Sequence, residues 1–286
     1  MLFDLFTSLT TPCPPYIRAL GYLDEAVAMR RRYRRNQEAW QSHLDNTRRF
    51  VLSTAEKCRD RSKAVILGSG LLLDVPLDEL SKMFREVVLM DVVCLPEIRK
   101  RIKRYNNVSF IEHDATAIAE RLSLNRQKKD HRLPEVTPVP DAGSGDAGLI
   151  VSLNVLSQLW VVPRTFVGQH LSTIAPEQVD EWCKQLVESH YAWLSSRSRD
   201  VCLVADFEQV KRDSTGSIIS KSSTVYGLKL PDPDATWTWN IAPFGRQNPH
   251  SSKELTVGAW HVSYQKRPAH HGGMEKFEHA FNADRI

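Results

Sequence analysis

Apolar and polar positions divide the chain into a helical N-terminal part and an alternating part that follows it. From about Asp24 to Cys58, apolar residues recur at spacings of four and seven, so they share one face of a long helix. The residues on this face are Met29, Tyr33, Trp40, Leu44 and Val51. From Lys63 onward, short apolar runs alternate with amphipathic segments of helical length. Such alternation predicts βαβ units and a parallel sheet covered by helices.

The alternating part predicts individual helices and strands. The expected helices are 78–85, 96–105, 115–124 and 177–195. The expected strands are 64–67, 86–90, 108–111, 149–153 and 201–205, followed by β-rich runs at 218–219, 236–241 and 256–264. The last runs would close the sheet with an antiparallel pair and make it mixed.

Residues 127–148 break this alternation. The segment holds three prolines and three glycines and has no periodicity, so it predicts a long surface insertion. It could act as a lid, although a tolerated insertion is the favoured interpretation.

The composition is that of a globular chain. The 286 residues are 42% hydrophobic and 25% charged, which excludes collagen-like, disordered and coiled-coil classes. No apolar run approaches the roughly 20 residues that cross a bilayer, so we expect no membrane segment. The N-terminus carries Asp4 and no basic region, which is untypical of a signal peptide and favours a cytoplasmic protein. The five cysteines form no C-x-x-C pair, so neither a disulfide framework nor a metal site is expected.

The net charge of +4 is unevenly distributed. Residues 1–63 carry 12 of the 38 basic side chains but only 7 of the 34 acidic ones, so the positive surplus lies there. It is centred on a basic run, Arg30–Arg35, that contains Arg30, Arg31, Arg32, Arg34 and Arg35. Such a run can bind nucleic acid, but a solvated helix face is the favoured interpretation.

The main chemical signal follows the first predicted strand. Gly68, Ser69 and Gly70 form a Gly-x-Gly loop, which lets the backbone approach a ligand closely. Asp91 ends the second strand 23 residues after Gly68, a position suited to a carboxylate that binds both ribose hydroxyls. Together they predict a ligand that contains adenosine.

Two ligand classes compete for this loop. A dinucleotide fingerprint requires a glycine at position 73, where the chain has Leu73. Six residues also separate Gly70 from the next helical pattern, so no helix N-terminus faces a pyrophosphate there. A nucleoside without phosphates has neither requirement.

Residues 63–205 resemble a class I S-adenosylmethionine-dependent methyltransferase domain. The matching elements are the loop Leu67-Gly68-Ser69-Gly70, Asp91, the pair His113-Asp114 after the third strand, and the segment 150–159 that contains the fourth strand. The wider pattern, with its helical N-terminus and tryptophan-rich end, resembles uncharacterised bacterial proteins of methyltransferase type.

The resemblance implies S-adenosylmethionine as cofactor and a role for each matching residue. The glycine loop, including Ser69, would pack against the amino-acid part of the cofactor, and Asp91 would hold the ribose. Asp114 would bind the adenine amine, with His113 beside it. Asn154 would lie near the sulfonium, and Asn154 and Gln158 are the candidates for a part in the reaction.

The chain departs from the family pattern at several positions. Ile66 replaces the acidic residue two positions before the first glycine, and Leu72 replaces the third glycine. No Asn-Pro-Pro-Tyr or Asp-Pro-Pro-Tyr follows the fourth strand, so amino-group methylation of the adenine, cytosine or glutamine kind is not indicated.

Two further features of the second half have open interpretations. Asp206 and Glu208 follow the fifth strand and could face a substrate, although a turn is the favoured interpretation. Trp237 and Trp239 alternate and so share a strand face, which is more often core than the wall of an acceptor site.

The sequence therefore predicts an α/β fold with a Rossmann-like mixed seven-stranded sheet flanked by helices. Residues 1–62 would form an N-terminal helical cap, 63–267 the methyltransferase-like domain and 268–286 a flexible tail. The predicted function is methyl transfer to an unidentified acceptor, with a small molecule favoured over protein or nucleic acid. The alternatives are a non-catalytic scaffold on a degenerate methyltransferase fold and, more distantly, a nicotinamide-dependent oxidoreductase.

Overall fold

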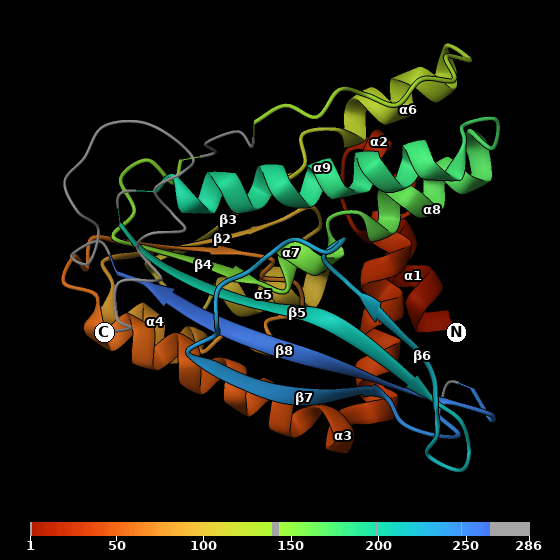
Figure 1. Ribbon diagram of the computed structural model, residues 1–286. Coiled ribbons are helices and arrows are strands. Elements are labelled where there is room, and N and C mark those ends of the chain that lie inside the picture. The colour runs from red at the N-terminus through yellow and green to blue at the C-terminus, as the bar shows by residue number, and fades with distance from the viewer. Residues whose placement is uncertain (1, 139–142, 198, 247, 264–286) are drawn as a thin grey trace.

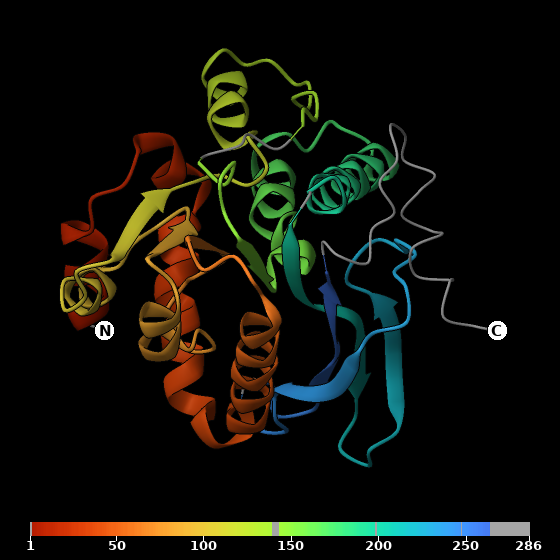
Figure 2. The same ribbon diagram turned by 90° about the vertical axis from the view of Figure 1, so that its left-hand side faces the viewer.

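The fold is built on one mixed sheet with helices on both faces (Figures 1 and 2). The structure, a computed structural model, describes residues 2–138, 143–197, 199–246 and 248–263. The strands are β1 (Lys63–Leu67), β2 (Glu86–Asp91), β3 (Val108–Glu112), β4 (Leu149–Leu153), β5 (Asp200–Arg212), β6 (Ile218–Ser223), β7 (Ala235–Ala242) and β8 (Ser252–Val262). The helices are α1 (Leu2–Thr10), α2 (Pro15–Leu20), α3 (Tyr22–Lys57), α4 (Leu77–Met83), α5 (Pro96–Ile102), α6 (Ala119–Gln127), α7 (Val155–Gln158), α8 (Val161–His170) and α9 (Pro176–Ser195).

The strand order confirms the expected Rossmann-like mixed α/β class. The order is β3-β2-β1-β4-β5-β8-β7, with β1 to β5 parallel and β8 antiparallel to both of its neighbours. The sheet has eight strands, not the predicted seven, because β6 pairs with the second half of β5. The sequence shows only Ile218 and Ile219 as β-rich there, and polar residues complete the strand.

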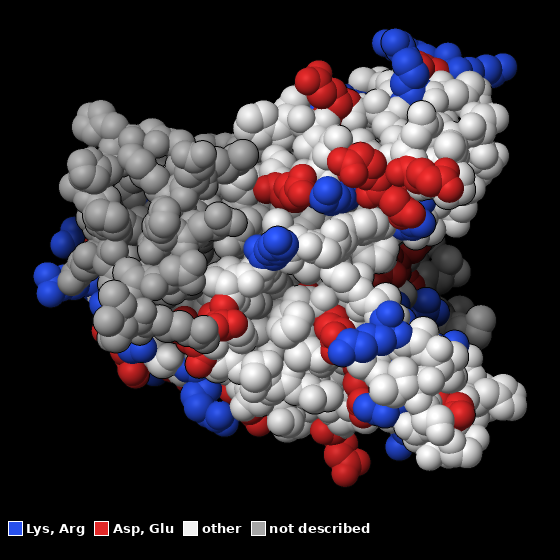
Figure 3. All heavy atoms as spheres, viewed as in Figure 1, with Lys and Arg blue, Asp and Glu red and all other residues white. Residues whose placement is uncertain are grey.

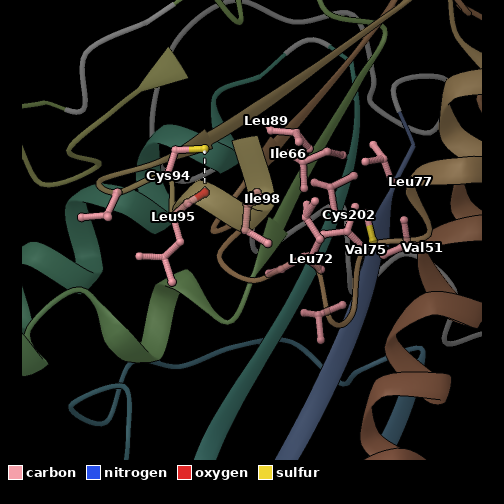
Figure 4. Close-up of a cluster of buried hydrophobic side chains, with 14 of the residues drawn as sticks. Val51, Ile66, Leu72, Val75, Leu77, Leu89, Cys94, Leu95, Ile98 and Cys202 are labelled. Carbon is pink, nitrogen blue, oxygen red and sulfur yellow. Dashed lines mark hydrogen bonds between the residues drawn. The ribbon is translucent and has the colours of Figure 1, made fainter. Parts of the chain in front are cut away.

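Apolar side chains of β1, β2 and β4 pack on both faces of the sheet, which explains why the buried positions of these strands are almost all apolar. On one face, Ile66 belongs to a cluster with Val51 of α3 and Leu77 of α4 (Figure 4). On the other face, Val65 packs in a second cluster with Val187 of α9. The sheet is therefore the middle layer between α3, α4 and α5 on one side and α6, α8 and α9 on the other (Figure 2).

Strand β5 runs far beyond its predicted end. The apolar run stops at Ala205, but the strand continues to Arg212 by pairing with β8 and β6. The prediction that Asp206 and Glu208 lie in a turn is therefore wrong, because both residues are in the ladder with β8. Between them, Phe207 is an extra residue that has no partner on β8, so the strand has a β-bulge.

The long predicted helix is present as α3, but it is not straight. Asn36 has non-helical dihedral angles (φ −124°, ψ 22°), and its side-chain Nδ2 donates to the Arg32 carbonyl at 2.9 Å. A side chain that bonds the carbonyl four residues earlier can bend a helix. The kink turns the first half of α3 across one end of the sheet, whereas the second half lies along its face (Figure 1).

Several local predictions need correction. The proline-rich start contains α1 and α2, and α7 and α8 follow β4 directly, none of which the apolar pattern indicated. Helix α6 begins at Ala119 rather than at 115, because the Asp114 carboxylate accepts the amides of Thr116 and Ala119 and holds a turn there.

Most of the predicted insertion 127–148 is described, and part of it is anchored to α9. The Trp182 indole donates to the Pro134 carbonyl at 2.8 Å, and Ser189 donates to the Thr137 carbonyl at 3.3 Å. The predicted flexible tail, 268–286, lies outside the described residues.

Candidate functional site

A cavity of about 590 Å³ opens at the end of the sheet where the parallel strands finish. Its walls come from the loops after β1, β2, β3 and β4, from both halves of α3, and from the extended strands β5, β7 and β8. All the site residues predicted from the sequence lie on its wall: Gly68, Ser69, Gly70, Asp91, His113, Asp114, Asn154 and Gln158. The fold thus gathers residues that are up to 90 positions apart in the chain into one ligand-sized space.

The glycine loop is packed tightly against the end of β4. Gly68 has φ +75°, and a Cβ atom added there would lie 2.5 Å from both the Leu153 carbonyl oxygen and Val155 Cγ2. The amides of Gly68 and Ser69 donate to the Met90 carbonyl at 3.0 and 3.2 Å. These amides are therefore already bonded within the chain, which agrees with the argument against a pyrophosphate.

Asp91 is fixed by the backbone on either side of it. Its Oδ2 accepts the Gly70 amide and its Oδ1 accepts the Val92 amide, both at 2.7 Å. Burial raises the pKa of Asp91, while these amide bonds oppose the rise. Because a carboxylate can accept about four hydrogen bonds, capacity for two hydroxyl groups remains.

Asp114 serves the local structure as well as the cavity wall. Its Oδ1 accepts the Thr116 amide and its Oδ2 accepts the Ala119 amide, each at 2.9 Å. The Tyr22 hydroxyl is nearby, and burial raises the pKa of Tyr22 well above its ordinary value. Neighbouring His113 is tied to Asp91 through its backbone, since the His113 amide donates to the Asp91 carbonyl at 2.9 Å.

Three buried polar atoms on residues of the cavity wall have no hydrogen-bond partner among the described residues. One is Trp239 Nε1 of β7, and two lie near the glycine loop: Ser69 Oγ in the loop itself and Asn154 Oδ1 after β4. Asn154 is held in the left-handed region at φ 54°, and its Nδ2 donates to Asp74 Oδ2 at 3.2 Å. Leaving a buried polar atom unsatisfied costs about 1–3 kcal/mol, so these two atoms mark a place where a ligand would stabilise the protein.

Asp74 is a site residue that the sequence did not indicate. It lies on the cavity wall next to Asn154, and desolvation raises its pKa to about 6, although Arg48 and Asn154 oppose the shift. Asp74 follows the apolar stretch after the glycine loop, where its simplest interpretation is a helix cap. Only the fold of that loop brings its carboxylate to Asn154.

A second group of polar residues lines the cavity beyond Asn154. Ser157 Oγ donates to Asp206 Oδ1 at 2.6 Å, and Asp206 is buried. Burial raises the pKa of Asp206, whereas the Ser157 bond and Lys253 oppose the rise. The bulge at Phe207 shifts the alternation of β5, so that Asp206 and Gln209 both face the cavity. Glu208 does not line it and instead pairs with Lys221 at 2.7 Å.

Aromatic side chains form an apolar wall between α3 and β7. The His43 ring stacks on Trp239 with centroids 3.9 Å apart, and Trp40 meets Trp239 edge-on at 5.1 Å. His43 Nδ1 accepts the Trp237 indole N–H at 3.0 Å, and burial lowers the pKa of His43 to about 3, so this ring is neutral. Trp239 therefore belongs both to the core and to the cavity wall.

The basic run Arg30–Arg35 does not form one cationic surface. Arg30 is only 4% exposed and bonds Glu97 at 2.6 Å and Asp4 at 2.9 Å. Arg32 pairs with Glu25 on the cavity wall, while Arg31, Arg34 and Arg35 are exposed. On the face seen in Figure 3, acidic and basic side chains are interspersed. In the part of the chain that the structure describes, no helix has the length and apolar character needed to span a membrane.

Comparisons with known proteins found only distant structural similarities. No protein-family model matches the chain, and no curated protein matches it significantly. A precorrin-8w decarboxylase of Methanobacterium thermoautotrophicum is 15% identical over 74% of this chain and 89% of its own, with a TM-score of 0.29. The complex of DhpI with SAM and HEP is 11% identical over 81% and 96% of the two chains, with a TM-score of 0.31. The 23S rRNA methyltransferase ErmE is 10% identical over 75% and 67%, with a TM-score of 0.25. At such TM-scores these similarities carry no argument about fold or function, and the Rossmann-like mixed α/β class rests on the strand order described above.

Proposed function

We propose that this chain binds S-adenosylmethionine at the glycine loop and transfers its methyl group to an acceptor in the same cavity. The observation that carries the proposal is the pair of unsatisfied buried atoms, Ser69 Oγ and Asn154 Oδ1, beside a loop on which only glycine fits at position 68. A donor and acceptor group such as the amino-acid end of the cofactor would satisfy both atoms. The residues present therefore fit the cofactor.

Each part of the cofactor has a matching group on the wall. The unused lone pairs of Asp91 would accept the two ribose hydroxyls, and Asp114 with His113 would border the adenine. Asp74 would accept hydrogen bonds from the ammonium of the methionine part. It would thereby take the role of the acidic residue that the family has at the position of Ile66. Placing a cation beside Asp74 offsets the cost of burying its charge.

The bound cofactor supplies an electrophilic methyl group on a cationic sulfur. The chain aligns the acceptor with that methyl group and excludes water, which are the main contributions to such a displacement. Asp206 is the candidate proton acceptor, because it is buried on the wall beyond Asn154 and its pKa is raised. The hydrogen bond that Ser157 donates orients the Asp206 carboxylate. Gln158 also lines the cavity, but it is exposed to solvent.

Calorimetry tests cofactor binding. We expect S-adenosylmethionine and S-adenosylhomocysteine to bind one per chain, and NAD⁺ not to bind. Asp91→Ala should weaken both cofactor affinities at least about tenfold, because it removes charge-assisted bonds to the ribose. Asp24→Ala is the matched control, since Asp24 is an exposed aspartate outside the cavity. Binding of NAD⁺ alone would favour an oxidoreductase and overturn the proposal.

Methyl transfer needs a separate test. The protein is incubated with tritium-labelled S-adenosylmethionine and with small-molecule, protein or nucleic-acid fractions of cells that produce it. We expect label in the small-molecule fraction, and loss of that label with Asp206→Asn if the acceptor must lose a proton. If the cofactor binds but no fraction is labelled, a non-catalytic scaffold is the better account.

A further inference from the structure

A lysine on the wall of the cavity has features of a ligand-binding group. Lys253 of β8 is half-buried on the cavity wall, where its ladder partner is Lys211. Its ammonium group makes no hydrogen bond or ion pair within 4 Å to any side chain of the described residues. Desolvation lowers the pKa of Lys253, and the nearby cations Lys211 and Arg32 lower it further, while Asp206 opposes the shift. A half-buried ammonium that two cations repel would be stabilised by an anion.

The position of Lys253 relative to the reacting end of the cavity is given by a chain of contacts. The Asn154 amide donates to the Val204 carbonyl of β5, and Ser157 Oγ, which donates to the Asp206 carboxylate at 2.6 Å, lies 3.2 Å from the Asn154 carbonyl. Lys253 pairs with Lys211, farther along the same strand than Asp206. Lys253 therefore lies beyond Asp206 as seen from Asn154, on the side where an acceptor rather than the cofactor would bind.

The wall next to Lys253 is apolar on the side of β7. Leu255 follows Lys253 two residues later on the same face of β8, and Trp239 and Ile241 of β7 complete this side of the cavity. A ligand here must combine one charged group with an apolar body, because a fully polar molecule would leave its groups unsatisfied against these side chains.

We propose that the methyl acceptor is a small organic anion whose carboxylate or phosphate binds Lys253 and whose apolar body lies against Trp239, Ile241 and Leu255. This inference rests on the proposed function, since it names the class of acceptor for the same cavity. The cavity volume of about 590 Å³ must hold both the cofactor and the reacting part of the acceptor, which favours a small molecule as acceptor.

Matched acids and amides test the proposal. Protein saturated with S-adenosylhomocysteine is titrated with benzoate, 3-phenylpropionate and phenyl phosphate, and with benzamide, 3-phenylpropionamide and benzyl alcohol as their neutral counterparts. Ligand-observed NMR gives each Kd. We expect each acid that binds to do so at least about tenfold more tightly than its neutral counterpart, because only the acid can form a charge-assisted hydrogen bond with Lys253. The comparison of phenyl phosphate with the carboxylates separates the two kinds of anion.

Substitutions then assign the preference to Lys253. Lys253→Met should abolish the preference for acids, and Lys253→Arg should keep it, which guards against a variant that simply fails to fold. Lys221→Met is the matched control, because Lys221 is 59% exposed on β6 and does not line the cavity. Its acid preference should equal that of the wild type.

The outcomes separate this inference from the proposed function. Cofactor affinity of the Lys253→Met protein, measured by calorimetry, should equal that of the wild type. If the cofactor binds but acids bind no better than their neutral counterparts, or if Lys253→Met keeps the preference, the anion inference is wrong and methyl transfer stands. If acids bind through Lys253 but the cofactor does not bind, the cavity takes an anion and the proposed methyl transfer is wrong.

Discussion

Replacing Asp74 by asparagine should stabilise the empty protein and weaken cofactor binding at the same time. Asp74→Asn keeps the shape of the side chain and an oxygen for the Asn154 bond, but it removes a charge that desolvation disfavours. The difference between a pKa of about 6 in the folded chain and 3.8 in the unfolded chain, at about 1.4 kcal/mol per pKa unit, corresponds to about 3 kcal/mol. We expect the variant to exceed the wild type by up to this amount at pH 8.

The pH dependence of this gain follows from the direction of the shift. The pKa of Asp74 is higher in the folded chain than in the unfolded chain, so proton binding to Asp74 stabilises the folded state. This stabilisation is complete below about pH 4 and is lost as the pH rises through about 6. The advantage of Asp74→Asn should therefore fall to about half at pH 5. Urea unfolding of both proteins at pH 5 and pH 8 measures the two free energies of unfolding. If the variant has no advantage at pH 8, or if the advantage does not depend on pH, Asp74 is not a desolvated carboxylate.

Cofactor affinity provides the second half of the same test. An asparagine cannot neutralise the ammonium of the methionine part, so Asp74→Asn should bind S-adenosylmethionine more weakly by about tenfold. The matched control is Asp24→Asn, which makes the same change at an exposed position. An Asp74→Asn protein that is more stable and binds as tightly as the wild type would remove Asp74 from the cofactor site.

Three further predictions concern the loop and the basic run. Gly68→Ala should lower the melting temperature strongly, because the added Cβ would lie 2.5 Å from the Leu153 carbonyl oxygen. Gly216 also has a positive φ but lies in open space, so Gly216→Ala should cost only about 1 kcal/mol of stability. Equal losses in the two variants would contradict this packing. Arg30→Met should lower the urea midpoint and expose α1 to protease, because it removes the hydrogen bonds from Arg30 to Asp4 and Thr7 that hold α1 against α3. An unchanged urea midpoint would show that these bonds contribute nothing to stability. Binding to RNA or DNA, measured from low to moderate salt, should be weak, because the buried Arg30 cannot reach a phosphate. A steep salt dependence that is lost when the exposed arginines are replaced would instead favour a nucleic acid as the acceptor.

The parts of the site that sequence alone could predict are those that depend on local sequence. The glycine loop and Asp91 are encoded by residue type at the ends of two apolar strands, and the parallel pairing of β1 and β2 follows from the alternation of elements. Both ends then meet at one edge of the sheet, where the Gly70 amide bonds the Asp91 carboxylate. The half of the cavity around the glycine loop could therefore be anticipated.

The half of the cavity beyond Asn154 depends on features that no short sequence pattern contains. The bulge at Phe207 decides that Asp206 and Gln209 face the cavity, and it is visible only in the pairing of β5 with β8. Lys253 reaches the same wall because β8 lies between β7 and β5, which pairs Lys253 with Lys211, a residue much earlier in the chain. The kink at Asn36 likewise lets one helix supply two sides of the cavity, where the periodicity indicated a single straight face.

A crystal structure of the protein with S-adenosylhomocysteine tests the central claim most directly. The account predicts the ligand in the cavity, with its amino-acid part within hydrogen-bond distance of Ser69 Oγ and Asn154 Oδ1 and its ribose hydroxyls on Asp91. A structure in which the ligand lies elsewhere, or in which Ser69 and Asn154 remain without partners beside it, would contradict the account.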